Sequence, residues 1–191
     1  MTTGEVLLRR WTRAEYDRLL EQGFFQPGER VELIDGAIVT MAPQRSGHAA
    51  GISLSQEALR VAFGPAFHVR VQLPLALGPV SEPEPDLAVV VGTPRDRAGA
   101  SDDGGAGGRG GRHDARVRSG TKGAVYARAG IPEYWILNLA ERVLEVRRGP
   151  AAAPDGSDRW EYREVRRYGP DEVVSPLAVP AARIRVRDLL P

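Results

Sequence analysis

The chain of 191 residues has no cysteine and only three histidines, which are His48, His68 and His113. Without cysteine, disulfide bonds and thiolate metal sites are excluded. The histidines are far apart in the sequence, so a histidine-rich zinc site is not expected. A hard cation bound by carboxylate oxygens remains open.

Long apolar runs and an excess of one charge are also missing. No run is long enough to cross a bilayer, and no basic segment followed by an apolar one stands near residue 1, so we expect a cytoplasmic protein without a membrane partner. The formal net charge is +1, so any contact with nucleic acid must come from a local patch. Hydrophobic residues make up 42% of the chain, enough for the core of one domain spanning residues 1–191.

What the chain does have is an apolar run at residues 87–91 that predicts a strand buried on both faces. Pro85 cannot donate to a sheet and marks the start of this strand. Asp86 therefore lies at the mouth of a core strand, where a buried carboxylate is costly unless it has a partner. Two interpretations follow for Asp86: a metal ligand in a cleft, or an acid that caps the strand in solvent.

The segment before this strand predicts a helix, a hairpin and a second helix. Thr12 and Glu15 form a capping-box pattern, so a helix should start after Thr12. Within residues 30–41, apolar and polar residues alternate before Asp35-Gly36, and apolar residues return after it. This pattern predicts a hairpin with a two-residue turn. Residues 46–63 contain apolar side chains that can supply the packing contacts of a helix, so we expect a helix there.

Three polar residues in this region have two interpretations each. Glu32 lies opposite the apolar face of its strand, and a solvated position is favoured unless a second acid lies nearby. His48, in the first turn of the 46–63 helix, is more often a surface or capping residue than a ligand. Gln72, on the polar face of an alternating strand at 66–77, either touches a site at Asp86 or is solvated.

Residues 92–120 contain almost no apolar side chains and include a Gly/Arg-rich run. Such a segment cannot bury enough surface to offset its ordering entropy, so we expect a disordered insert within the domain. It does not have the Lys-Ser or Lys-Thr ending of a phosphate-binding loop.

The remainder of the chain predicts a helix followed by short strands. The expected helix covers residues 121–130 and ends at Gly130. The strands are expected at residues 133–138, 143–146, 160–168, 173–174 and 184–186, with a polar loop at 150–158.

Several sequence blocks resemble the Uma2 family of restriction endonucleases, a branch of the PD-(D/E)XK nuclease superfamily. The blocks are Val31-Glu32-Leu33-Ile34-Asp35-Gly36, then His48, then Glu84-Pro85-Asp86-Leu87-Ala88-Val89-Val90, then Lys122 with residues 126–136 and Asn138. The resemblance implies an α+β fold with a PD-(D/E)XK core, in which helices flank a mixed β-sheet. It also implies that the partner is DNA. A homodimer is possible, because two copies of a nuclease can cut the two strands of a duplex.

The same resemblance implies a three-part catalytic site. Asp86 would hold a divalent cation, Mg²⁺ or Mn²⁺, and Glu32 would complete its ligands. Lys122 would polarise the scissile phosphate or position the attacking water. His48 and Gln72 are secondary candidates. This set suits phosphodiester hydrolysis, which needs a hard metal and a nearby cation.

One departure from the family pattern bears on activity. The family has a further core strand before the lysine helix, with a glutamate as second metal ligand, but no glutamate occurs between residues 85 and 132. We therefore expect one core strand to be missing and the endonuclease to be impaired. The alternative is a catalytically dead nuclease-fold protein or remnant that binds nucleic acid or another partner.

Overall fold

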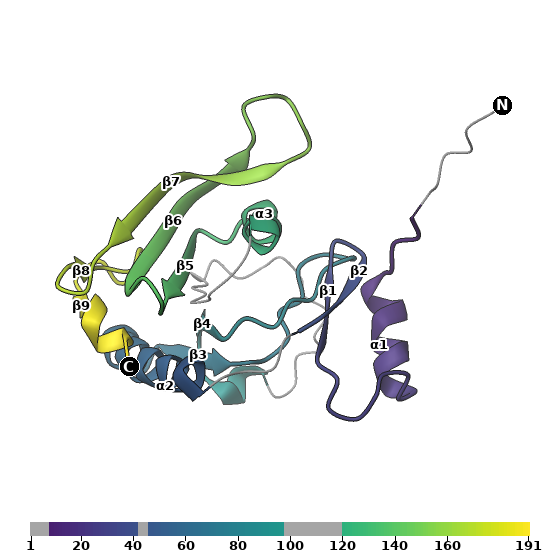
Figure 1. Ribbon diagram of the computed structural model, residues 1–191, viewed down its shortest axis with the longest axis horizontal. Coiled ribbons are helices and arrows are strands. Elements are labelled where there is room, and N and C mark those ends of the chain that lie inside the picture. The colour runs from purple at the N-terminus through teal and green to yellow at the C-terminus, as the bar shows by residue number, and fades with distance from the viewer. Residues whose placement is uncertain (1–7, 42–45, 98–119) are drawn as a thin grey trace.

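The computed structural model describes residues 8–41, 46–97 and 120–191. These residues form an α+β structure (Figure 1). In chain order its elements are α1 (Arg13–Glu21), β1 (Val31–Ile34), β2 (Ala37–Thr40), α2 (Ser46–Phe63), β3 (Phe67–Val71), β4 (Leu87–Val91), η1 (Pro94–Arg97), α3 (Gly120–Arg128), β5 (Glu133–Asn138), β6 (Val143–Ala152), β7 (Trp160–Tyr168), β8 (Val173–Val174), β9 (Ile184–Arg185) and η2 (Val186–Leu189).

All strand pairings between these elements are antiparallel. The strands form the pairs β1–β2, β3–β4 and β8–β9 and the three-stranded sheet β5–β6–β7. In Figure 1, β3 and β4 lie between the β1–β2 hairpin and the β5–β7 sheet, and α2 lies below them beside the C-terminal η2. Within the described ranges, these four small sheets stand where a mixed sheet was expected.

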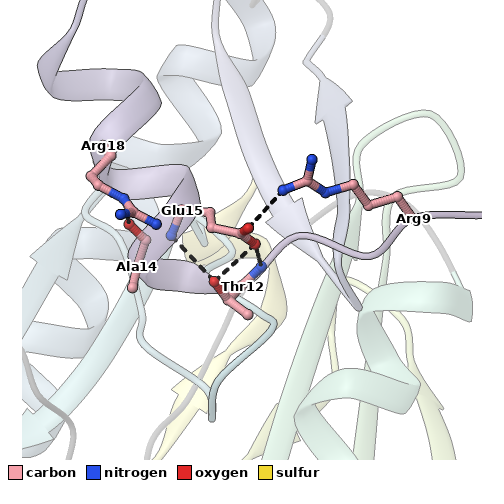
Figure 2. A network of polar contacts seen from close by, with 5 residues as sticks. All are labelled: Arg9, Thr12, Ala14, Glu15 and Arg18. Carbon is pink, nitrogen blue, oxygen red and sulfur yellow. Dashed lines mark hydrogen bonds and ion pairs between the residues drawn. The ribbon is translucent and has the colours of Figure 1, made fainter.

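Helix α1 begins with the predicted capping box, drawn in Figure 2. The Thr12 hydroxyl accepts a hydrogen bond from the Glu15 backbone N–H, and the Thr12 N–H donates to the Glu15 carboxylate at 2.9 Å. Arg9 donates to the other Glu15 oxygen at 2.7 Å. These contacts satisfy backbone donors that a helix start otherwise leaves without partners.

Helix α2 covers the main hydrophobic core. It buries Gly51, Ser55, Leu59 and Phe63 on one side, and this side packs on β3, β4 and the C-terminal η2. The remaining face of the helix is mixed, because it exposes Leu54 at 40% and Val61 at 75% together with the charged Glu57 and Arg60. Among the parts of the chain that the structure describes, no helix combines the length and the apolar character needed to cross a membrane.

An extended segment, residues 81–86, leads into β4 and lies between β1 and residues 72–77. The Glu82 N–H donates to the Leu33 carbonyl at 2.7 Å. On its other side, the Pro83 carbonyl accepts from Leu75 at 2.8 Å, and the Asp86 carbonyl accepts from Gln72 at 3.0 Å. The segment therefore positions Asp86 relative to β1, which carries Glu32.

A buried glutamate fixes the C-terminal part of the structure. Glu133, at the start of β5, is 0% exposed. One of its carboxylate oxygens accepts hydrogen bonds from Arg148 of β6 at 2.6 and 2.8 Å. Its other oxygen accepts from the Leu177 backbone N–H at 2.8 Å. A single side chain thus ties the β5–β6 pair to the segment that follows β8.

Strand β7 forms an outer edge of the three-stranded sheet. Its residues 163–167 are all exposed, and four of these five positions are charged. Glu164 lies among Arg163, Arg166 and Arg167, so both signs of charge occur on this edge.

Most predicted elements are confirmed, including the hairpin at Asp35-Gly36, the helix at 46–63 and the buried strand at 87–91. The loop predicted to start at residue 150 is wrong at its first residues, because β6 continues to Ala152 and pairs with β7 there.

The expected insert at 92–120 is shorter at both ends. Pro94–Arg97 forms a 3₁₀ turn, and Gly120 belongs to α3. The rest of the insert, with the position of the missing strand, lies outside the described residues.

We expect the capping box to stabilise the protein less in acid. Hydrogen bonds from the Thr12 backbone and from Arg9 lower the pKa of Glu15 from 4.5 to about 2. A carboxylate with a lowered pKa stabilises the folded state above its unfolded pKa, and this contribution disappears as the pH falls through the folded pKa. The free energy of unfolding should therefore differ between wild type and Glu15→Gln above about pH 4.5, and this difference should shrink towards about pH 2.

Urea unfolding at several pH values measures this difference. Glu21→Gln, on the same helix but outside the capping box, is the control. A wild-type minus Glu15→Gln difference that is independent of pH would contradict the assignment.

Candidate active site

Glu32 and Lys122 form a buried ion pair. Glu32 lies in β1 and is 0% exposed, and Lys122 lies in the first turn of α3 and is 6% exposed. The Lys122 Nζ contacts the Glu32 Oε2. The solvated position favoured for Glu32 is therefore wrong, because the carboxylate is buried and the Lys122 side chain of α3 reaches it and supplies a cation.

Asp86 and His48 form a second pair. Asp86 is 2% exposed, and its Oδ1 lies 3.2 Å from the His48 Nε2 in the first turn of α2. With its proton on Nε2, the imidazole donates a hydrogen bond to the carboxylate. His48 is therefore a partly exposed partner of Asp86, and a ligand role for it stays a prediction. The solvent-exposed cap considered for Asp86 is wrong, because this carboxylate is buried.

Gln72 lies directly opposite Asp86 in an unusual backbone conformation. Its N–H donates to the Asp86 carbonyl at 3.0 Å, and its φ is +48°, a left-handed value that costs a non-glycine residue free energy. Its side-chain Nε2 is buried and has no hydrogen-bond partner in the described part of the protein. A buried hydrogen-bond donor without an acceptor is rare, and it marks a position where a ligand can supply the acceptor.

The neighbouring acids each have an arginine partner. Glu82 pairs with Arg13 at 2.7 Å, and Glu84 pairs with Arg30 at 3.3 Å. These pairs reduce the negative charge beside Asp86, which would otherwise repel a phosphate. Sequence reasoning missed both arginines, because each pairing joins segments far apart in the chain.

Arg147 on β6 is a further basic residue that sequence reasoning missed. Its guanidinium would lie 3.0 Å from a Cβ at position 123, so Gly123 leaves the room it needs against α3, next to Lys122. It also pairs with Glu145 at 2.6 Å and lies over the Tyr134 ring. A glycine inside a short helix after the lysine was the available signal for this close approach.

The structure thus arranges the predicted site residues as two pairs, Glu32 with Lys122 and His48 with Asp86. Gln72 lies beside the second pair. Among the described residues, no group of three or more His, Asp or Glu side chains is placed to hold a metal ion. Glu32 therefore does not join His48 and Asp86 in such a group.

We expect Lys122→Met to lower the free energy of unfolding by roughly 3 kcal/mol, because the Glu32 carboxylate would stay buried without its cation. The double variant Glu32→Gln/Lys122→Met should recover most of this loss. Chemical denaturation of both variants measures it, and a double variant no more stable than Lys122→Met would contradict a charge-pairing role.

We expect Gln72→Gly to raise the free energy of unfolding by roughly 1 kcal/mol, since glycine adopts a positive φ without strain. Arg142→Gly is the matched control, because Arg142 has a φ of +53° in an exposed turn. Denaturant midpoints measure the gain in both. A loss of stability in Gln72→Gly alone would mean that the side chain supports the fold rather than a ligand.

Comparison with known proteins finds a matching family model and matching solved structures. The model of the Uma2 family, described as "Putative restriction endonuclease", matches residues 13–106. A crystal structure of a putative nuclease belonging to DUF820 from Anabaena variabilis superposes with a TM-score of 0.65 at 17% identity, over 93% of this chain and 96% of that chain. No curated protein matches. The chain is therefore similar to the Uma2 family over residues 13–106, and it shares the fold of that putative nuclease.

Proposed function

We propose that this protein is a metal-dependent endonuclease that hydrolyses phosphodiester bonds of DNA. The observation that carries the proposal is the meeting of Glu32 with Lys122 and of His48 with Asp86, from four separate segments of the chain. Segment 81–86 connects the two pairs through the backbone, since Glu82 bonds to the residue after Glu32. Buried and paired ionisable groups of this kind concentrate at functional sites.

The donor atoms suit a divalent cation of the Mg²⁺ or Mn²⁺ type at Asp86. Mg²⁺ in nucleotide-processing enzymes is commonly held by one or two carboxylates, with waters and substrate phosphates as its other ligands. Asp86 offers a carboxylate whose position is fixed by burial at 2% exposure. When bound, such a cation would stabilise charge on the phosphoryl oxygens and acidify a bound water.

The other residues act on the phosphate and on one another. Lys122 supplies a fixed positive charge for a phosphoryl oxygen, and Glu32 orients its ammonium group. A direct contact of Glu32 with the cation stays a prediction. The Gln72 amide can donate to a phosphate oxygen or to the attacking water, because its Nε2 has no acceptor among the described residues.

The alternative is a nuclease-fold protein that binds nucleic acid without cutting it. It is favoured by the lack of a three-acid cluster in the described ranges, because two-metal and carboxylate-rich sites need more than one acid on the cation. A single domain and a homodimer stay predictions in either case.

Nicking of supercoiled plasmid in Mg²⁺ and in Mn²⁺ tests the proposal. We expect Asp86→Asn and Lys122→Met each to reduce the nicking rate by about 100-fold or more, because each removes charge stabilisation in the transition state. Glu57→Gln, at an exposed position of α2, is the control and should nick at the wild-type rate.

A wild-type protein that binds DNA but does not nick it would favour the alternative. Nicking that persists in a folded Asp86→Asn variant would place the chemistry elsewhere.

A further inference from the structure

The separation of two atoms at Asp86 suggests which metal this site takes. The His48 Nε2 and the Asp86 Oδ1 are 3.2 Å apart. Two adjacent ligand atoms, each about 2.1 Å from one cation, are roughly 3.0 Å apart at a right angle and roughly 3.4 Å apart at a tetrahedral angle. The observed separation falls between these values, so one ion can take the place of the hydrogen-bonding proton with little movement of either side chain.

We propose that His48 and Asp86 together ligate the cation, and that the site therefore prefers a transition metal such as Co²⁺ or Zn²⁺ to Mg²⁺. The inference rests on the proposed metal site and adds an imidazole ligand to it. Imidazole nitrogen binds first-row transition metals well, whereas Mg²⁺ prefers oxygen ligands.

The burial of the two side chains supports a shared ion. The Asp86 side chain is 2% exposed, while the His48 side chain is 24% exposed. The carboxylate is therefore fixed in the protein, and the histidine side stays open to solvent. Water molecules or substrate phosphate oxygens can approach from this open side and complete the ligand set.

The small number of protein ligands around Asp86 gives the His48 nitrogen a large share in binding the cation. No third His, Asp or Glu side chain joins the pair in the described ranges. An oxygen-only site would then rest on Asp86 alone. The imidazole adds a second protein ligand and favours metals that accept nitrogen.

Titration of the full-length protein with Co²⁺, followed by visible absorption and calorimetry, tests the inference without any nuclease assay. We expect wild type to bind Co²⁺ at least about tenfold more tightly than Mg²⁺. His48→Ala should lose about tenfold or more in Co²⁺ affinity and change the visible spectrum, while its Mg²⁺ affinity changes little. His48→Gln is a second variant in case truncation harms folding. Asp86→Asn should lose both metals.

His68→Asn and His113→Asn are the matched controls, since these are the other histidines of the chain, and both should keep the Co²⁺ spectrum. If folded His48→Ala binds Co²⁺ with wild-type affinity and spectrum while Asp86→Asn does not, the cation sits on Asp86 without the imidazole. The inference then fails and the proposed metal site stands. If neither metal depends on Asp86, the inference fails together with the metal-dependent function.

Discussion

The structure depends on one constraint: a charge taken out of water must meet a partner. Among the described residues, Glu32, Asp86 and Glu133 are at most 2% exposed. Each carboxylate contacts a basic side chain from another element. These contacts join β1 to α3, the start of β4 to α2, and β5 to β6. The same groups that cost free energy to bury therefore specify which elements meet.

The extended segment 81–86 places Asp86 relative to β1, which carries Glu32, and so brings the two pairs into one candidate site. A strand that only filled the core would need no polar group at its entrance, yet here the entrance carries Asp86 and the backbone acceptor for Gln72. Gln72 keeps a left-handed backbone, and strain of this kind persists where the surroundings over-determine it. The buried carboxylate of Asp86 and the strained backbone of Gln72 therefore both cost folding free energy at the positions proposed to act in the chemistry.

Local patterns were sufficient to predict most elements, because capping, alternation and turn residues act within a few positions. The Thr12 capping box and the Asp35-Gly36 turn are examples. The partners of buried charges were not predictable in this way. Whether Glu32 faces water or Lys122 depends on where α3 packs, and no local pattern carries that information. The extension of β6 to Ala152 likewise depends on its pairing with β7 rather than on its own residues.

The outer edge formed by β7 bears on how two copies of the chain can associate. An unpaired strand edge offers backbone donors and acceptors to any other extended chain, and charged side chains oppose such pairing. The exposed arginines and glutamate of residues 163–167 provide this protection, since pairing with another strand would take these charged side chains partly out of water. The sheet can therefore present a long exposed edge with little tendency to grow into an intermolecular sheet.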